Sequence, residues 1–276
     1  MSTDGSISNS HQVSLNQGGI RLSQHIYNNH PEIDFTIVCG SRPDLLARTL
    51  ESFSQKLFPN FRFSASFANI DLFGGNEEDR DKCEALLLSY FPEIKISKPT
   101  TPSYGKAVKS LWLQTTSPFI FHLEDDWIAL ECVQPEMVFR HFSSDVKVVT
   151  LTSKEHKLDK HIKRYGDYYL RAIDRKKLFG LTLWSSSHND HGVSPGFFDG
   201  KFARKWASMI DPNLDPEKQV KKSINKPLFD FVTQYKRRML TGVNQLELIQ
   251  DIGREWHAKV GIKKSVINGK SIWTDY

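Results

Sequence analysis

The sequence predicts an α/β protein with a mostly parallel central sheet flanked by helices, followed by a less regular C-terminal half. Short apolar runs alternate with helical patterns in the order β-α-β-α-β-α-β through about residue 127. Such alternation is typical of a parallel sheet with helices on both faces. In addition, polar groups follow the apolar runs, where open α/β sheets bind their ligands. These groups are 40–42, Asp71 and the acidic triplet 124–126.

The elements of the first half follow from local patterns. A helix is expected to begin at Pro43-Asp44, because proline is favoured in the first turn and apolar residues then recur on one face. The helix over 77–90 carries its acids in the first turn, where the helix dipole stabilises them. We expect strands at 34–39, 61–67, 93–97 and 118–123, and helices beginning at 43, 77 and 104.

The second half has weaker patterns. A β-branched run over 146–151 predicts a strand. Further strands are expected at 168–171 and 178–184, a polar loop at 185–195 with His188 and His191, and helices at 197–209, 227–240 and 244–259. Trp127, Trp184 and the segment 194–198 are candidates for an aromatic acceptor wall, because aromatic rings stack on sugar rings and nucleobases, and core packing is the alternative for each.

The composition is that of a water-soluble protein. Hydrophobic residues make up 39% and charged residues 25%, and no apolar run is long enough to span a bilayer. Residues 1–31 are polar and predict a flexible lead-in without a secretory signal. A single domain is expected over 32–276, with halves at 32–130 and 131–276. The three cysteines, Cys39, Cys83 and Cys132, predict buried thiols in a reducing, cytoplasmic setting.

Glu124, Asp125 and Asp126 directly follow a buried strand. Three carboxylates in a partly dry site repel one another, so a positive charge is expected beside them. Mn²⁺ or Mg²⁺ is the simplest candidate, because hard cations bind carboxylates and share them with substrate phosphates. The alternative is a solvated turn stabilised by a helix N-terminus.

The net charge is +5, and much of the basic excess lies after residue 150. This distribution indicates either solvated faces or contact with an anionic partner, such as donor phosphates, nucleic acid or a membrane surface.

These segments, in this order, resemble the GT-A fold glycosyltransferases, and especially the inverting group called family 2. Residues 36–53 look like that group's opening strand, turn and helix, and Gly105-Lys106-Ala107 like its donor-contacting segment. The segment 122–127, HLEDDW, looks like its DxD-type metal motif, and 250–256 is similar to the opening of its catalytic helix. The chain departs from the pattern at Glu124, where Asp is usual, and at Gln250, where Glu is usual.

The resemblance implies a Rossmann-like GT-A sheet and a metal-dependent, hexosyltransferase-type enzyme. It would move a sugar from a nucleotide sugar, most often UDP-linked, to a hydroxyl with inversion. It also implies roles for individual residues. The implied nucleotide-binding residues are Cys39, Gly40, Ser41, Arg42, Asp71, Lys106, Glu124 and Asp125. The implied metal ligands are Asp126, Glu124 and His257. The implied catalytic base is Asp251, with Glu247, one helical turn earlier, as the fallback.

Two other classes remain open. A nucleotidyltransferase also combines an α/β sheet with acidic metal ligands, although its phosphate-binding loop is usually richer in glycine than 40–43. The other class is a catalytically inactive GT-A-like module that binds carbohydrate or nucleic acid. This alternative is allowed because Gln250 stands where the family usually has Glu. For an active transferase, the acceptor is a saccharide, a lipid-linked sugar, a protein or a modified nucleic acid.

Overall fold

The structure is a computed structural model that describes residues 30–178, 181–220, 224–244 and 246–275. The expected lead-in over 1–31 therefore lies outside the described residues except for its last two. Among the described residues, no helix combines the length and the apolar character that crossing a membrane requires.

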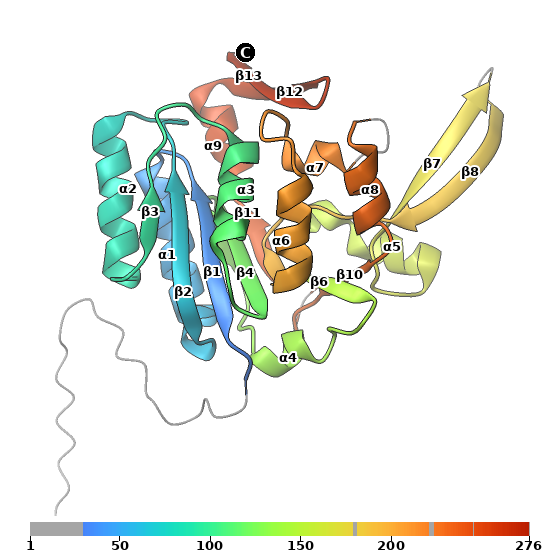
Figure 1. The fold of residues 1–276 in the computed structure, drawn as a ribbon, viewed down its shortest axis with the longest axis horizontal. Helices are drawn as coiled ribbons and strands as arrows, with labels where there is room; N and C mark the ends of the chain where they lie inside the picture. Colours follow the sequence, from blue (N-terminus) through green and yellow to red (C-terminus); the bar gives the residue numbers. More distant parts are fainter. Residues whose placement is uncertain (1–29, 179–180, 221–223, 245, 276) are drawn as a thin grey trace, which may run out of the picture.

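A seven-stranded sheet forms the centre of the molecule (Figure 1). Its strands are β1 (Ile33–Cys39), β2 (Phe63–Ile70), β3 (Lys95–Ser97), β4 (Phe119–Glu124), β6 (Val146–Leu151), β9 (Gly196–Asp199) and β10 (Lys236–Leu240). They lie in the order β10-β6-β9-β4-β1-β2-β3. Every neighbouring pair is parallel except those of β9, which runs antiparallel to both β4 and β6. The predicted α/β class is confirmed.

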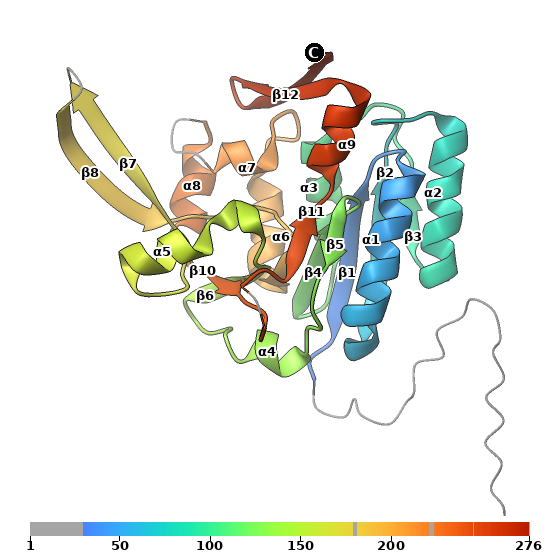
Figure 2. The ribbon, with the colours of Figure 1, turned by 180° about the vertical axis from the view of Figure 1, so that it is seen from behind.

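Helices cover both faces of the sheet (Figures 1 and 2). The helices α1 (Pro43–Lys56) and α2 (Glu77–Tyr90) pack on one face through one hydrophobic cluster. The helices α3 (Tyr104–Gln114), α6 (Gly200–Met209) and α8 (Lys226–Val232) pack on the other through a second cluster. In β1, Phe35 and Ile37 face the first cluster and Val38 faces the second, as the two-residue repeat of a buried strand requires.

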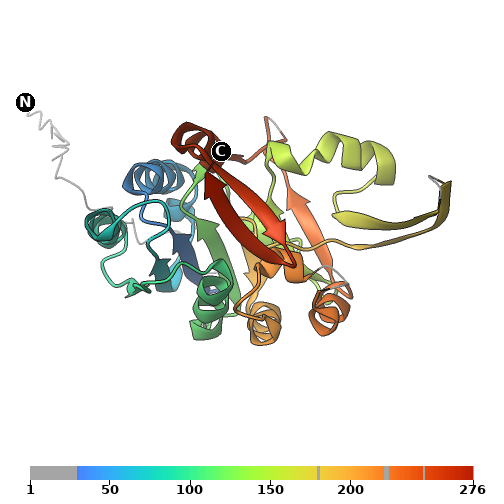
Figure 3. The same cartoon turned by 90° about the horizontal axis from the view of Figure 1, so that it is seen from above.

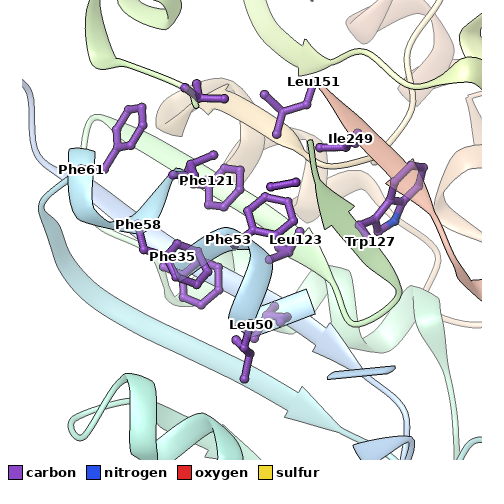
Figure 4. Close-up of a cluster of buried hydrophobic side chains, with 14 of the residues drawn as sticks. Phe35, Leu50, Phe53, Phe58, Phe61, Phe121, Leu123, Trp127, Leu151 and Ile249 are labelled. Carbon is purple, nitrogen blue, oxygen red and sulfur yellow. The ribbon is translucent and has the colours of Figure 1, made fainter. Parts of the chain in front are cut away.

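Phenylalanines dominate the first cluster (Figure 4). Phe121 of β4 stacks on Phe35 of β1 at 5.9 Å between ring centroids, and it packs on Phe197 of β9 at 4.7 Å. Phe53 of α1 covers Phe121 at 6.0 Å. This aromatic layer joins the two halves of the sheet in one core.

Smaller elements surround the sheet. The helices α4 (Pro135–Phe139), α5 (Leu158–Tyr165), α7 (Pro216–Gln219) and α9 (Gly253–Val260) lie in the second half. β5 (Trp127–Ala129) pairs with β11 (Ile249–Asp251) in an antiparallel ribbon. The hairpin of β7 (Arg171–Leu178) and β8 (Leu181–Asn189) projects from the body, whereas the hairpin of β12 (Ile262–Ile267) and β13 (Lys270–Asp275) lies above the carboxyl ends of the central strands (Figures 1 and 3).

The first half matches the prediction to within a few residues, but the second half differs in several places. The segment 197–209 is not helical throughout, because Phe197 and Phe198 form strand β9. Both side chains are fully buried, each in a different cluster. The same burial removes them from the expected acceptor wall.

Two further helix predictions are partly wrong. The helix expected over 227–240 ends at Val232, and β10 follows it as a sheet strand. The helix expected over 244–259 is confined to Gly253–Val260, because Ile249–Asp251 pairs with β5 instead. The strands expected at 168–171 and 178–184 are the two arms of one hairpin, shifted along the chain.

The three cysteines differ in burial. Cys39 and Cys83 are buried, as predicted, whereas Cys132 is exposed and that prediction is wrong. Cys132 lies in the loop after β5, between an acid and the core residue Val133.

Asp34 fixes the start of β4 and provides a test of this packing. Its buried carboxylate accepts hydrogen bonds from the amide groups of Thr116 (2.6 Å) and Ser117 (2.9 Å) and from the Ser117 hydroxyl (2.8 Å). Replacing Asp34 with Ala leaves these donors unpaired, so we expect the free energy of unfolding to fall by roughly 2–4 kcal/mol. Urea denaturation measures this change. The exposed Glu51→Ala serves as the control, and equal stability of both variants would contradict the assignment.

His122 predicts a pH dependence of stability. Its buried ring receives hydrogen bonds from Trp112 Nε1 (3.2 Å) and Thr36 Oγ1 (2.9 Å), and burial lowers its pKa to about 3. In the unfolded chain His122 binds a proton as the pH falls below about 6.5, whereas in the folded state it stays neutral. The free energy of unfolding therefore decreases as the pH falls below that value.

Wild type and His122→Gln share all other titrating groups, so their difference isolates this histidine. Between pH 6 and 5 we expect the wild type to lose up to about 1.4 kcal/mol more of unfolding free energy than the variant. Denaturation at each pH measures it. Identical slopes for wild type and His122→Gln would contradict the assignment.

Candidate functional site

The candidate site lies at the carboxyl ends of β1, β2 and β4. The three strands are adjacent and parallel, with Cys39 beside Ile70 and Val38 beside Glu124. The polar groups that follow each strand therefore meet at one edge of the sheet, as the sequence predicted. These groups are the turn after Cys39, Asp71 and the acidic triplet.

Asp125 forms the centre of the site through its pairing with Arg42. Its Oδ2 accepts hydrogen bonds from Gly40 N (3.0 Å) and Arg42 Nε (3.2 Å), and its Oδ1 accepts one from Arg42 Nη2. Arg42 Nη2 also lies 3.3 Å from Asp126 Oδ2. Burial opposes the charge of Arg42, but Asp125 and Asp126 outweigh it and raise the pKa of the guanidinium. Part of the positive charge expected beside the triplet is therefore Arg42.

Two aromatic rings enclose the Arg42 guanidinium. Its central carbon lies 5.3 Å from the ring centroid of Phe73 and 5.1 Å from that of Trp256. Such cation–π contacts strengthen in a desolvated setting. Arg42 Nη1 is buried and has no hydrogen-bond partner. The guanidinium is thus held in place with one donor nitrogen unused.

The two outer acids of the triplet are less well neutralised. Glu124 accepts hydrogen bonds from Trp127 Nε1 (3.0 Å) and from the hydroxyl of Tyr104. Burial, aided by the charge of Asp126, raises the pKa of Glu124. Burial also raises the pKa of Asp126, against the opposing effect of Arg42. Both sites favour a bound positive charge, either a proton or a cation.

Asp251 reaches this site through the β5–β11 ribbon. It pairs with Trp127, and the next residue, Ile252, donates its amide to Asp126 O at 2.9 Å. The carboxylate accepts hydrogen bonds from Gly253 N (2.9 Å) and Arg254 N (3.3 Å) at the start of α9, and from Arg254 Nε (2.9 Å). Asp251 thus stabilises the start of α9, and it also lies beside the triplet.

Gly253 allows α9 to approach Asp126 closely. A Cβ atom at this position would lie 2.3 Å from Asp126 Oδ2. Any other residue would displace the Asp126 carboxylate. This contact was not apparent from the sequence, where Gly253 is only one residue of the segment 250–256.

The structure explains the departure at Gln250. Residues 250 and 251 belong to strand β11, so their side chains point to opposite faces, and Gln250 is exposed. An acid at position 250 would point away from Asp251. Glu247 precedes this strand in a non-helical segment, so the one-turn spacing that made it the fallback base is wrong.

His257 lies in α9 near the aromatic rings of the site. Its ring is 4.4 Å from that of Trp273 in β13 and 5.4 Å from that of Trp256. Burial and the nearby Arg42 lower its pKa, and its Nε2 is buried without a hydrogen-bond partner. The structure therefore brings a neutral imidazole with an unused nitrogen to the same edge.

The residues expected to bind a nucleotide fall into two groups. The side chains of Cys39 and Ser41 are buried, and the Ser41 hydroxyl donates to Asp71 O at 2.7 Å. The Asp71 carboxylate is also buried, and it accepts hydrogen bonds from Phe73 N (3.0 Å) and Ser103 N (3.3 Å). These side chains shape the loops. Lys106, in the first turn of α3, is exposed.

The remaining candidates have other positions. Trp127 is buried against the core and donates to Glu124. His191 is buried, not solvated, and its Nε2 lies 2.9 Å from Tyr235 O. His188 belongs to β8, which occupies half of the expected loop. The side chain of Trp184 lies outside the described residues.

Sequence reasoning missed Tyr104 and the role of Trp256. Tyr104 precedes the Gly105-Lys106 segment and binds Glu124 through its hydroxyl, a long-range contact without a local signal. Trp256 was inside the segment singled out near the C-terminus, but its contact with Arg42 depends on the β5–β11 pairing.

Comparisons with known proteins give a fold but no family. No protein-family profile matches the chain, and no curated protein matches it by sequence. Among solved structures, it is similar to the mannosyltransferase PcManGT from Pyrobaculum calidifontis in complex with GDP-Man and Mn²⁺, with a TM-score of 0.53 and 9% identity. That match covers 84% of this chain and 60% of the mannosyltransferase.

A second match is TarS from S. aureus in complex with UDP-GlcNAc, with a TM-score of 0.39 and 12% identity over 79% of this chain and 58% of TarS. This likeness is too low to support an argument. The chain spans about three fifths of the length of either protein. It shares the fold of the mannosyltransferase, in agreement with the GT-A resemblance.

Replacing Arg42 with Met tests the ion pair at the centre of the site. The variant leaves Asp125 buried without its partner, which costs roughly 3–5 kcal/mol of unfolding free energy. Adding Asp125→Asn removes the unpaired charge and should recover part of this loss. Urea denaturation of the single and double variants measures both effects. Arg48→Met, on the exposed side of α1, is the matched control, and a single variant as stable as this control would refute the pairing.

Proposed function

We propose that this protein is a metal-dependent inverting glycosyltransferase that moves a hexosyl group from a nucleotide sugar, a UDP-sugar in the first instance, to a hydroxyl group. The observation that carries the proposal is the position of Asp251. It belongs to a segment 125 residues beyond Asp126, yet its neighbour Ile252 bonds Asp126 directly and Gly253 packs on the Asp126 carboxylate. A candidate base and candidate metal ligands thus adjoin in a fold shared with a mannosyltransferase.

The acids at the site fit a divalent cation that shares its ligands with the donor. The described residues contain no group of three or more His, Cys, Asp or Glu side chains placed to hold a metal ion alone. Mg²⁺ and Mn²⁺ are commonly held by one or two carboxylates plus substrate phosphates. Glu124 and Asp126 supply two such carboxylates, and their pKa values are raised mainly by burial and then by neighbouring carboxylates, so a bound cation would stabilise their ionised forms. His257 lies at the same edge with an unused Nε2, but it forms no three-residue metal-binding group with these two acids among the described residues.

When bound, the cation would stabilise the charge that develops on the departing diphosphate. Arg42 holds Asp125 and Asp126 in place, and its unused Nη1 is a donor for a phosphate oxygen. Lys106 adds a second positive charge from the start of α3. Gly40 and Asp71 place the two loops between which the nucleotide would lie. In the solved mannosyltransferase complex, the ligands are GDP-Man and Mn²⁺, which supports this class of donor and metal.

Asp251 is the proposed general base. The acceptor hydroxyl oxygen attacks the anomeric carbon of the donor sugar while the bond to the diphosphate oxygen breaks, and Asp251 takes the hydroxyl proton. Asp251 is paired with Arg254, whose side chain is 68% exposed. Solvent screens such a pair, so breaking it costs little free energy. The products are the glycoside and the nucleoside diphosphate.

Donor binding and turnover test separate parts of this proposal. In a thermal-shift panel of UDP- and GDP-sugars with Mn²⁺ or Mg²⁺, we expect at least one pair to raise the melting temperature of the wild type. Asp126→Asn and Glu124→Gln should lose the metal-dependent part of that shift. Asp251→Asn should keep it, and its sugar transfer should fall about 100-fold or more, because the general base is absent.

Asp44→Asn, an exposed acid at the start of α1, is the matched control and should behave like the wild type. The absence of any shift with every nucleotide sugar, with or without metal, would refute the proposed function. Transfer of a nucleotidyl group instead of a sugar, detected by the mass of the product, would favour a nucleotidyltransferase.

A further inference from the structure

A second polar cluster lies in the second half of the molecule, beyond the candidate donor site. We call it the Arg237 cluster, and it comprises Arg237 of β10, Asp190 and His191 before β9, and Glu217 of α7. Because β9 runs antiparallel to its neighbours, the segment before it lies at the carboxyl ends of β4 and β6. The cluster extends from this edge, where Gly192 approaches Glu217, toward the start of β10, where His191 lies beside Tyr235.

Arg237 is an unusual buried cation. It is 3% exposed, and its Nε donates to Thr150 Oγ1 at 2.7 Å. Its Nη2 is buried and has no hydrogen-bond partner. Burial lowers its pKa, which the charges of Asp190 and Glu217 oppose without a close ion pair to either. An unused donor on a buried guanidinium is costly, so a ligand that accepts a hydrogen bond is favoured here.

His191 contributes the complementary atom. It is 4% exposed, and its Nε2 lies 2.9 Å from Tyr235 O, a carbonyl that can only accept. The ring proton is therefore on Nε2, and burial keeps the ring neutral by lowering its pKa to about 3. Its Nδ1 is then an acceptor, and it has no partner. The cluster thus contains one unused donor and one unused acceptor, both buried.

Gly192 places Glu217 opposite Arg237. A Cβ on Gly192 would lie 2.9 Å from Glu217 Oε1 and 3.0 Å from Arg237 Nη1, so the absence of a side chain keeps the two groups close. Glu217 also acts electrostatically on Glu124 and Tyr104 of the donor site. The Arg237 cluster is therefore close enough to the donor site for charges of the two groups to interact.

We propose that the Arg237 cluster binds the ring hydroxyl groups of a saccharide acceptor. A hydroxyl group both donates and accepts, which matches the unused Arg237 Nη2 and His191 Nδ1. Asp190 and Glu217, both partly exposed, provide further acceptors for neighbouring hydroxyls. Two carboxylates beside one guanidinium disfavour an anionic group. This inference rests on the proposed function, because it assigns the acceptor of the same reaction.

Direct binding tests the inference without any turnover. Methyl glycosides of glucose, galactose, mannose and N-acetylglucosamine are added to the protein with Mn²⁺ and UDP or GDP, and saturation-transfer NMR detects the bound sugar. We expect at least one glycoside to bind the wild type. Its dissociation constant should rise tenfold or more in Arg237→Gln, Glu217→Gln and Asp190→Asn.

Arg204→Gln is the matched control. Arg204 of α6 binds carbonyl oxygens of Thr115 and Ser117 at the opposite edge of the sheet, so its loss should leave glycoside binding unchanged. If Arg237→Gln does not fold, the two partly exposed carboxylate variants still decide the question. Failure of every glycoside to bind the wild type, tighter binding of inorganic phosphate at the same residues, or unchanged affinity in the folded variants would each overturn the inference.

Donor hydrolysis distinguishes a failure of this inference from a failure of the proposed function. Mass detection of sugar released from nucleotide sugars in the absence of an acceptor reports on the donor site alone. We expect Arg237→Gln and Asp190→Asn to keep this hydrolysis within about twofold of the wild type and to lose transfer to the glycoside through its KM. Donor hydrolysis without any glycoside binding would refute the saccharide acceptor and leave the transferase standing. Glycoside binding without any nucleotide-sugar binding would do the reverse.

Discussion

The ion pair of Arg42 and Asp125 is the interaction on which the site depends. It joins the turn after β1 to the turn after β4, and the Asp125 carbonyl extends the link to α1 by accepting from Thr49 Oγ1 at 2.8 Å. With Arg42 and Gly40 saturating the Asp125 carboxylate, that residue is the internal anchor of the triplet. Glu124 and Asp126 on either side have fewer partners: Glu124 is bound by Trp127 and Tyr104, and Asp126 by Arg42.

A second constraint is the antiparallel ribbon of β5 and β11. The ribbon starts directly after the acidic triplet, so its register decides which residue of the C-terminal segment lies beside Asp126. Asp251 occupies that place and Gly253 leaves room for the carboxylate. The ribbon also brings Trp256 onto Arg42, so the late segment and the first turn of the chain support each other.

The sequence predicted the first half of this arrangement well, because its signals are local. Apolar runs, first-turn acids and polar strand ends are sufficient to place Arg42, Asp71 and the triplet at one edge. The second half was harder for a physical reason. Phe197 and Phe198, or the run Lys236–Leu240, acquire their strand conformation from neighbouring strands, and no local period distinguishes them from a helix. For the same reason, the partners of Arg237 and the contact of Gly253 with Asp126 were not visible.

The antiparallel strand β9 has a consequence for how the chain is assembled. Until residues 196–199 insert beside it, β4 has an unpaired edge, and the Phe121 ring lacks its neighbour Phe197. An emerging or truncated chain that ends near residue 130 therefore presents an apolar strand edge of the kind that recruits other chains. The insertion of β9 closes this edge and also positions the preceding residues, Asp190 to Val193. The sheet and the Arg237 cluster are therefore completed in the same folding step.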